Sequence, residues 1–242
     1  MLVADAVWWN STFHHDALLG ALDEFYGGLP SPVDSRRTTI EGRSTVIAPG
    51  VEADRLITAP RQDRTRPLVL WNQRWDHDKN PHAVFSALAR LADEGVPFTL
   101  ALAGQNQRPD SSDFAFVQER LGDRIDHRGF LPVGEYEQLL LESDVVVSAA
   151  DHEFFGIALV EAMAAGAVPV LPSRLSFPEL IDTRWHGAVL YPDGELRPGL
   201  RQVLEDLPNA RAKLAGLRVS MARFDAVAAA ESHDLAVSEL VS

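Results

Sequence analysis

Apolar residues along the chain fall into short runs separated by longer segments of helical spacing, and this alternation is regular from residue 67 onward. The run 68–71 (LVLW) holds no polar residue, which is typical of a strand buried on both faces of a sheet. Asn80 and Pro81 suit the N-cap and first position of a helix that is predicted to run to about Glu94. The same pattern predicts further strands at 98–104, 124–130, 144–148 and 168–171, and helices at 113–121, 133–142 and 156–165. Such alternation predicts an α/β fold with a doubly wound parallel sheet.

The two ends of the chain depart from this regular pattern. Before residue 60, the pattern predicts a strand at 6–11, a helix at 13–25 that stops at 27–30, and a strand at 45–51. The segment 59–67 (APRQDRTRP) is polar, bounded by proline and rich in arginine, as interdomain linkers often are. From Pro198 to Ser242 we expect two or three amphipathic helices. We therefore divide the chain into residues 1–60, 61–205 and 206–242.

Composition narrows the class of protein. Of the 242 residues, 46% are hydrophobic, which is enough to bury one large core or two modest ones. The net charge of −13 provides no general attraction to nucleic acid or anionic membranes, although a local basic groove is compatible with it. The absence of cysteine excludes disulfides, thiolate metal sites and cysteine nucleophiles. With no apolar run of about 18 residues and no signal-peptide pattern at the start, we expect a cytoplasmic protein without a membrane segment.

The loops after the predicted strands are the places for chemistry, because ligands of an open parallel sheet bind beyond the carboxyl ends of its strands. The segment 72–79 (NQRWDHDK) places Arg74 and Lys79 between a strand and a helix N-terminus. An arginine fork, a lysine charge and the free N–H groups of a helix start together suit a diphosphate. The alternative is a solvated loop in which both cations pair with its two aspartates. From these residues alone, both interpretations stay open.

Two further features of this loop concern ligands. Asp76-His77-Asp78 matches an Asp-x-Asp metal signature, but any acidic loop can produce that match, and we expect no metal there. Asn72, the first residue of the loop, is a further candidate ligand-binding residue.

A second loop leads into a helix that carries two glutamates. Glu153 lies just before this helix, and Glu161 lies two turns inside it among apolar residues. A carboxylate among apolar residues costs free energy unless it is hydrogen-bonded, and a pair of sugar or ribose hydroxyls is a fitting partner. For Glu161, the alternatives are an internal salt bridge or an exposed helix face. For Glu153, the alternative is a carboxylate that only interacts favourably with the dipole of the helix.

Backbone groups and apolar surfaces complete the candidate site. At Phe155-Gly156, backbone N–H groups can approach a phosphate because glycine has no side chain to block it, and Ile157 continues this turn. Phe130 ends the strand predicted at 124–130, and Leu131 follows it. Both present an apolar surface that suits a nucleobase; the alternative is a simple strand-to-helix turn.

The sequence around these residues resembles a known enzyme family. Glu153 and Glu161 resemble the Glu-x7-Glu signature of retaining glycosyltransferases of family 4, which have the glycosyltransferase B fold. The segment 153–170 (EFFGIALVEAMAAGAVPV) is similar to the sequence usual in that family around the signature. The resemblance implies that Glu161 binds the ribose and Glu153 the transferred sugar, while Arg74 and Lys79 bind the diphosphate without an obligatory metal.

The resemblance also assigns parts to the domains. It implies that residues 61–205 are the Rossmann-like, nucleotide-sugar-binding C-terminal domain, and that residues 1–60 are a remnant of the acceptor-side N-terminal domain. Because most of that second domain is missing, we expect a fragment, a truncated form or a degenerate relative.

Within the family, the segments 70–81, 152–156 and 175–180 resemble the tRNA-queuosine mannosyltransferases, which transfer mannose from GDP-mannose to the queuosine base of a tRNA. The resemblance implies this transfer, with tRNA bound through the missing domain. One alternative is transfer from a UDP- or GDP-sugar to a lipid or small-molecule acceptor, and another is an inactive nucleotide-sugar-binding module. The segment 172–179 replaces the glycine-rich donor loop common in the family, so the choice of donor stays open.

Overall fold

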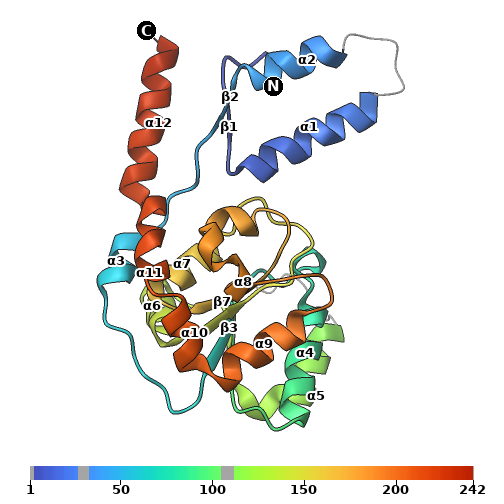
Figure 1. Cartoon of the computed structure of the whole chain (residues 1–242), viewed down its shortest axis with the longest axis vertical. Coiled ribbons are helices and arrows are strands. Elements are labelled where there is room, and N and C mark those ends of the chain that lie inside the picture. Colours follow the sequence, from blue (N-terminus) through green and yellow to red (C-terminus); the bar gives the residue numbers. More distant parts are fainter. Residues whose placement is uncertain (1–2, 27–32, 105–111, 242) are drawn as a thin grey trace.

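The computed structural model describes residues 3–26, 33–104 and 112–241, so the expected helix stop at 27–30 lies outside the described residues. The described chain contains a six-stranded sheet and a separate two-stranded sheet. Figure 1 shows the larger sheet with its helices in the lower body, and the N-terminal elements and the last helix above it.

The larger sheet is parallel throughout, with the strand order β5-β4-β3-β6-β7-β8. Its strands are β3 (Leu68–Trp71), β4 (Thr99–Ala103), β5 (Ile125–Gly129), β6 (Val145–Val147), β7 (Val168–Pro172) and β8 (Leu190–Tyr191). From β3 the chain moves outward to β5, then returns beside β3 with β6 and moves outward the other way. This order confirms the predicted doubly wound α/β fold. Strand β8 was not predicted, because two residues are too short a run to stand out.

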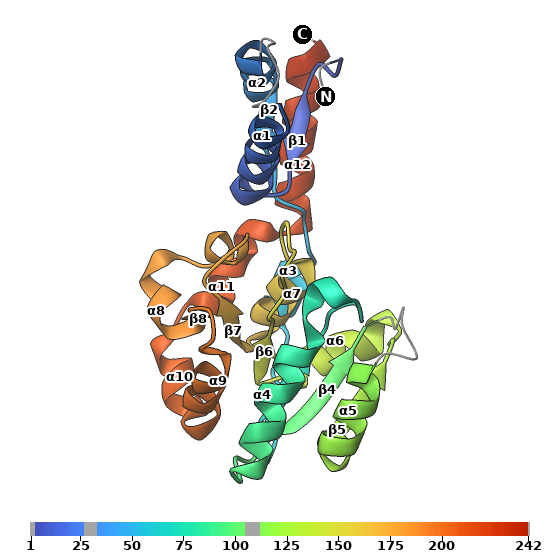
Figure 2. The same cartoon turned by 90° about the vertical axis from the view of Figure 1, so that its right-hand side faces the viewer.

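Helices cover both faces of this sheet. One face carries α4 (Pro81–Asp93), α5 (Ser112–Leu121) and α9 (Leu196–Glu205), and the other carries α3 (Ala53–Thr58), α6 (Val133–Glu142), α7 (Ile157–Ala165) and α11 (Leu217–Ser220) (Figure 2). The strands between them are fully buried at their centres, from Leu68 to Trp71 in β3 and from Val145 to Val147 in β6. Short elements complete this body: η1 (His77–Lys79), η2 (Gly122–Arg124), η3 (Phe177–Leu180), η4 (Thr183–Trp185), α8 (His186–Val189), α10 (Leu207–Lys213) and η5 (Met221–Phe224).

The N-terminal elements form a small unit with its own core. In it, β1 (Val7–Trp9) pairs in parallel with β2 (Ser44–Val46), next to α1 (Thr12–Tyr26) and α2 (Val33–Glu41). Its buried cluster consists of Trp9, Leu19 and Ile40. Helix α2 was not predicted, because VDSRRTTIE has too few apolar residues to show a helical spacing. Strand β2 ends before the Pro-Gly pair at 49–50 and is shorter than the strand predicted for 45–51.

The C-terminal segment differs from the prediction of two or three amphipathic helices. Its described part has four α-helices, because Asp206 caps a new helix at α10 and Gly216 and Asp225 mark further breaks. The last of them, α12 (Ala226–Val241), has no buried residue and lies beside the N-terminal unit in both views (Figures 1 and 2). His233 of α12 meets Trp8 edge-on, with ring centroids 5.4 Å apart. The division at 60 and 205 stays a prediction.

Candidate functional site

Two loops meet at the centre of the large sheet, between β3 and β6, where the direction in which successive strands are added to the sheet reverses. The carbonyl oxygen of Asp78, in the first loop, accepts hydrogen bonds from the N–H groups of Asp151 at 2.8 Å and His152 at 3.3 Å in the second. Ligands of doubly wound sheets bind at such a reversal, beyond the carboxyl ends of the strands. A cavity of about 260 Å³ lies there, lined by Asn72, Gln73, Arg74, Lys79, Glu153, Gly156, Ala158 and Leu159.

Lys79 is the most tightly held cation of this cavity. Its side chain is largely buried, and its Nζ donates to the carbonyl oxygen of His152 at 2.7 Å. The same Nζ lies 3.2 Å from Asp78 Oδ2 and 3.3 Å from Glu153 Oε2. A buried ammonium group needs such partners to offset its loss of hydration. Lys79 and Glu153 therefore fix each other's position at the cavity wall.

Arg74 is held far more loosely than Lys79. Its side chain is 54% exposed, and its Nη2 lies 3.7 Å from Asp78 Oδ2. Both cations thus pair with Asp78, as in the alternative of a solvated loop. Asp76 instead accepts a hydrogen bond from the N–H of His77. Since one long, exposed ion pair contributes little, this contact leaves most of the donors of Arg74 unused.

Helix α7 starts at the same cavity with an open N-terminus. Its N-cap is Gly156, with φ at 108°, and no side chain caps the helix there. The Leu159 N–H donates to the carbonyl oxygen of Gly156 at 3.0 Å, which leaves the N–H groups of Ile157 and Ala158 for an anion, and the helix dipole favours an anion there. Phe155 is occupied within the protein, because its ring is buried and packs edge-on against Phe224 at 5.3 Å, and its N–H donates to Glu153 Oε1 at 3.3 Å. Ile157 is 46% exposed at the start of the helix.

Glu161 lies behind the cavity in a hydrogen-bonded group. Its Oε2 accepts from the hydroxyl of Tyr136 at 3.0 Å, and Asn72 Nδ2 donates to that same hydroxyl at 3.0 Å and to the carbonyl oxygen of Ala158 at 2.8 Å. Burial raises the pKa of Glu161, and the hydrogen bond from Tyr136 opposes that rise. Burial also raises the pKa of the Tyr136 hydroxyl, which keeps it a donor. Within the described residues Glu161 has no ion pair, so the internal salt bridge considered above is absent there.

The structure thus brings together five of the predicted site residues around one cavity, namely Asn72, Arg74, Lys79, Glu153 and Gly156. Glu161 is linked to Asn72 through the hydroxyl of Tyr136. Phe130 and Leu131 lie apart, because they follow the edge strand β5 and β4 separates it from β3. Phe130 is 76% exposed and does not line the cavity.

Sequence patterns missed two residues that shape the site. Tyr136 lies on α6 and reaches Glu161 on α7, a contact between helices that no periodicity reveals. Ser176 is fully buried, and its hydroxyl bridges the carbonyl oxygens of Glu153 at 3.2 Å and Phe155 at 3.0 Å. Segment 175–180 was singled out in the sequence only for its resemblance, and the signal that points to Ser176 is the burial of a polar side chain.

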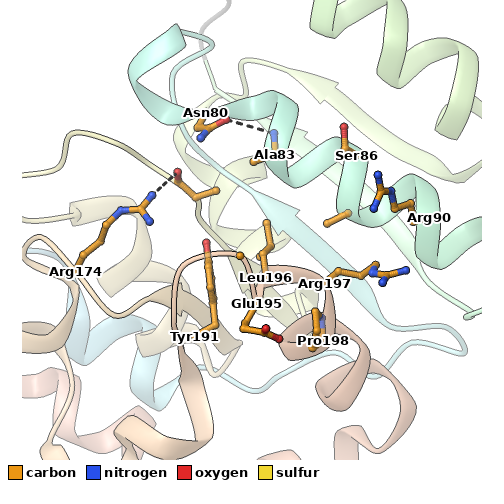
Figure 3. Close-up of a pocket in the computed structure, with 13 residues that line it drawn as sticks. Asn80, Ala83, Ser86, Arg90, Arg174, Tyr191, Glu195, Leu196, Arg197 and Pro198 are labelled. Atoms are coloured by element: carbon orange, nitrogen blue, oxygen red, sulfur yellow. Dashed lines mark hydrogen bonds between the residues drawn. The ribbon is translucent and has the colours of Figure 1, made fainter.

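A second cavity, of about 510 Å³, holds none of the predicted site residues (Figure 3). Arg90 of α4 and Arg197 of α9 lie on one side of it, and Arg174 lies across from them. Arg174 is bound within the protein, because it donates to the carbonyl oxygen of Ala149 at 3.2 Å and pairs with Asp151 and Asp193. This cavity lies between α4 and the start of α9, and Asn80 and Ala149, from the loops after β3 and β6, also line it.

Residues 3–26, 33–104 and 112–241 contain no group of three or more His, Asp or Glu side chains suited to a metal ion. No helix in this same part of the chain is both long and apolar enough to cross a membrane.

Comparison with known proteins identifies the family. Residues 53–215 match the family model described as glycosyl transferases group 1. The chain is 33% identical over 189 residues to a Drosophila melanogaster tRNA-queuosine alpha-mannosyltransferase, covering 74% of the chain and 50% of that protein. It is 30% identical over 132 residues to a Streptomyces kanamyceticus 2-deoxystreptamine glucosyltransferase, covering 50% of the chain and 34% of that protein. The chain thus spans half or less of the length of both relatives.

Solved structures agree on the fold. The sucrose-phosphate synthase of Thermosynechococcus elongatus matches 98% of the chain and 59% of its own length, with a TM-score of 0.73 and 22% identity. This likeness confirms the predicted glycosyltransferase B fold class. Together with the family match over 53–215, it supports one conclusion: the chain belongs to the group 1 family of glycosyl transferases.

Proposed function

We propose that the cavity between the loops after β3 and β6 binds a nucleotide sugar, and that the chain supplies the donor-binding half of a retaining glycosyltransferase. The observation that carries this proposal is the set of groups around one cavity: Arg74, Lys79 and the uncapped start of α7 next to the carboxylate of Glu153. Two cations and free N–H groups suit a diphosphate, and a carboxylate beside them suits the hydroxyls of the attached sugar.

Each residue has a role in this proposal. Arg74, Lys79 and the first turn of α7 bind the diphosphate, Glu153 binds the hydroxyls of the transferred sugar, and Glu161 binds the ribose. Tyr136 orients Glu161, because its hydroxyl donates to that carboxylate at 3.0 Å. None of these roles needs a metal ion.

The proposed chemistry depends on stabilising the leaving group. When the bond between the anomeric carbon and the diphosphate oxygen breaks, the electron pair stays on the diphosphate. The acceptor hydroxyl forms the new bond from the same face of the sugar, and its proton passes to the departing phosphate. Arg74, Lys79 and the helix N–H groups neutralise the charge that develops there, which is the largest effect such a site offers.

For the substrates, we propose mannose from GDP-mannose as the donor group and the queuosine base of a tRNA as the acceptor. The support is the similarity to the Drosophila mannosyltransferase over 74% of the chain. Similarity to a 2-deoxystreptamine glucosyltransferase keeps a small-molecule acceptor as a second candidate. A nucleotide-sugar-binding module without transfer activity is the candidate from a different class.

Calorimetric titration with GDP, UDP, GDP-mannose and UDP-glucose tests the proposal, first without metal and then with Mg²⁺. We expect saturable binding of GDP and GDP-mannose without metal, and affinity that Mg²⁺ leaves nearly unchanged. Binding of UDP compounds alone would contradict the GDP-mannose assignment but keep the nucleotide-sugar site. Failure of all four to bind would contradict the site itself.

A further inference from the structure

The large sheet and the helices that cover it form the donor-binding body of the proposed function. Helix α1 of the N-terminal unit starts against this body, and a residue of the body caps it. The N–H groups of Thr12 and Phe13 donate to the two carboxylate oxygens of Glu179, at 2.8 and 2.6 Å. The next N–H, of His14, donates to Ser11 Oγ at 3.0 Å. The first turn of a helix leaves its N–H groups without partners, and a carboxylate there is stabilising. A residue 167 positions away thus supplies most of the cap of α1.

The start of α1 also contacts the loop that carries Glu153. Ser11 Oγ donates to the carbonyl oxygen of Phe154, the next residue after Glu153, at 2.6 Å. The ring of His14 stacks on that of Phe154, with centroids 4.2 Å apart and planes 25° apart. In both views of the molecule the start of α1 is the end of this helix nearest to the lower body (Figures 1 and 2).

Glu179 is itself held firmly by the donor-binding body. It belongs to η3, its N–H donates to the carbonyl oxygen of Ser176 at 3.0 Å, and its own carbonyl oxygen accepts from Arg223 at 3.1 Å. Ser176 in turn bridges the carbonyl oxygens of Glu153 and Phe155. One short segment therefore fixes the backbone of the Glu153 loop and presents the carboxylate that holds α1.

We propose that Glu179 is a positioning residue for transfer: its carboxylate anchors α1, and so holds the N-terminal unit at a fixed place over Glu153. The distance between the donor sugar and the wall opposite it then depends on this contact. The proposal rests on the proposed function, because Glu153 is taken there as the sugar ligand. The side chain of Glu179 contacts α1 and does not line the donor cavity. It therefore determines the position of the N-terminal unit and not the affinity for the donor.

Distance measurement between spin labels tests this role, and the absence of native cysteine makes specific labelling simple. One label is placed at Ala17→Cys on α1 and the other at Glu119→Cys on α5, both exposed positions. We expect one narrow distance distribution in the otherwise native chain. In Glu179→Ala we expect a broader distribution with a longer component, because two hydrogen bonds to a charged group are lost. The ratio of chains in which α1 has separated from Glu179 to chains in which it is in place should rise by about tenfold or more. The matched control Glu195→Ala removes an exposed carboxylate and should leave the distribution narrow.

A second variant separates loss of the contact from loss of the helix. Thr12→Pro removes one donated N–H at the first position of α1, where proline favours a helix. We expect a broadening between those of the native chain and Glu179→Ala, with the circular dichroism of the helices retained. An unchanged distribution in Glu179→Ala, or in Thr12→Pro while Glu179→Ala broadens, would overturn the positioning role.

Calorimetry with GDP-mannose on the same variants keeps the two proposals apart. The affinity of Glu179→Ala should stay within about twofold of the native value, because additivity holds for groups that do not touch. Donor binding with unchanged label distances would overturn only the role of Glu179. A native chain that fails to bind GDP-mannose would overturn the proposed donor and, with it, a role in transfer, whatever the distances show.

Discussion

At the scale of single residues, Lys79 is the side chain on which the candidate site most depends, because it is buried and contacts three oxygen atoms. Lys79→Ala should weaken GDP-mannose binding by about 10- to 100-fold, since a hydrogen bond to a charged phosphate contributes about 1.5–3 kcal/mol. It should also cost about 1–3 kcal/mol of unfolding free energy, because Asp78 and Glu153 lose their contacts with the buried ammonium group. Calorimetry and urea denaturation measure the two effects.

The chain provides a matched control for this substitution, because Lys213 is its only other lysine. Lys213 lies exposed on α10, so Lys213→Ala should change neither donor affinity nor stability by more than about 0.5 kcal/mol. Native donor affinity in folded Lys79→Ala would contradict the assignment of Lys79 to the diphosphate.

Glu161 leads to a prediction about pH. Burial raises its pKa above the ordinary value of 4.5, so the folded protein binds a proton there that the unfolded chain has already released. Stability that depends on this group is therefore present at low pH and falls as pH rises from about 4.5 through the raised pKa. Glu161→Gln, which cannot ionise, should gain unfolding free energy relative to the native chain over that range. Urea denaturation of both proteins between pH 4 and pH 8 measures the difference, and a difference that shrinks as pH rises would contradict the prediction.

Tyr136 supplies the internal test of this interpretation. Its hydroxyl donates to Glu161 and lowers the pKa of that carboxyl, against the effect of burial. Tyr136→Phe should thus raise the pKa of Glu161 further and extend the pH range over which stability falls. The same variant should weaken donor binding if Glu161 needs Tyr136 to orient it toward the ribose.

At the scale of elements, the ends of β3 and β4 approach too closely for any side chain at Gly104. This glycine has φ at 140°, and an added Cβ would lie 2.3 Å from the carbonyl oxygen of Gln73. Gly104→Ala should cost about 2–4 kcal/mol of unfolding free energy, from backbone strain together with the forced shift of Gln73. Because Gln73 lines the donor cavity, GDP-mannose binding should weaken as well.

Gly134 is the matched control for Gly104→Ala. It lies in α6 with nothing within 4 Å of an added Cβ. Gly134→Ala should be neutral or stabilise the protein by about 0.5 kcal/mol, since alanine favours a helix more than glycine does. Equal stability changes in the two variants, measured by urea denaturation, would contradict the steric argument.

The same scale explains which features the sequence could predict. Continuous apolar runs such as 68–71 mark strands buried on both faces, and their alternation with helices indicates a parallel sheet. The large sheet was thus predictable, whereas the order of its strands comes from the structure. Residues directly after β3 and β6 were predictable as site residues because parallel strands end at one edge. Contacts across elements were not: Tyr136 reaches Glu161 from another helix, and Glu179 caps α1 from a segment 166 residues away. Helix α2 was missed because it has too few apolar residues to show a period.

At the scale of the whole molecule, arginines join the linker before β3 to the donor-binding body. Arg61 donates to the carbonyl oxygens of Ala165 at 3.1 Å and Ser143 at 2.9 Å. Arg218 donates to the carbonyl oxygens of Leu56 and Ala59, both at 2.6 Å. These guanidinium groups satisfy carbonyls at the ends of α3 and α7, so the segment that leads from the N-terminal unit is fixed to the body at several points.

Asp144 lies at the amino end of β6, at the opposite end of the strands from the donor cavity. It is buried just before β6, where its Oδ2 accepts from the N–H of Leu68 at 2.9 Å and its Oδ1 pairs with Arg61 and Arg211. Asp144→Ala should cost about 3–5 kcal/mol of unfolding free energy, because it leaves two partly buried guanidinium groups without their shared counter-ion. Urea denaturation followed by tryptophan fluorescence measures the loss, since Trp71 is fully buried in β3.

The position of Asp144 also predicts what this substitution should leave unchanged. Strands of about four residues separate it from the donor cavity by about 13 Å, at about 3.3 Å per residue, and it shares no partner with Lys79 or Glu153. Under conditions in which Asp144→Ala is still folded, its affinity for GDP-mannose should therefore match that of the native chain. Asp193→Ala, which removes an 81% exposed carboxylate, should cost no more than about 1 kcal/mol. If Asp144→Ala is no less stable than Asp193→Ala, the two partly buried arginines do not depend on this carboxylate, and the prediction is wrong.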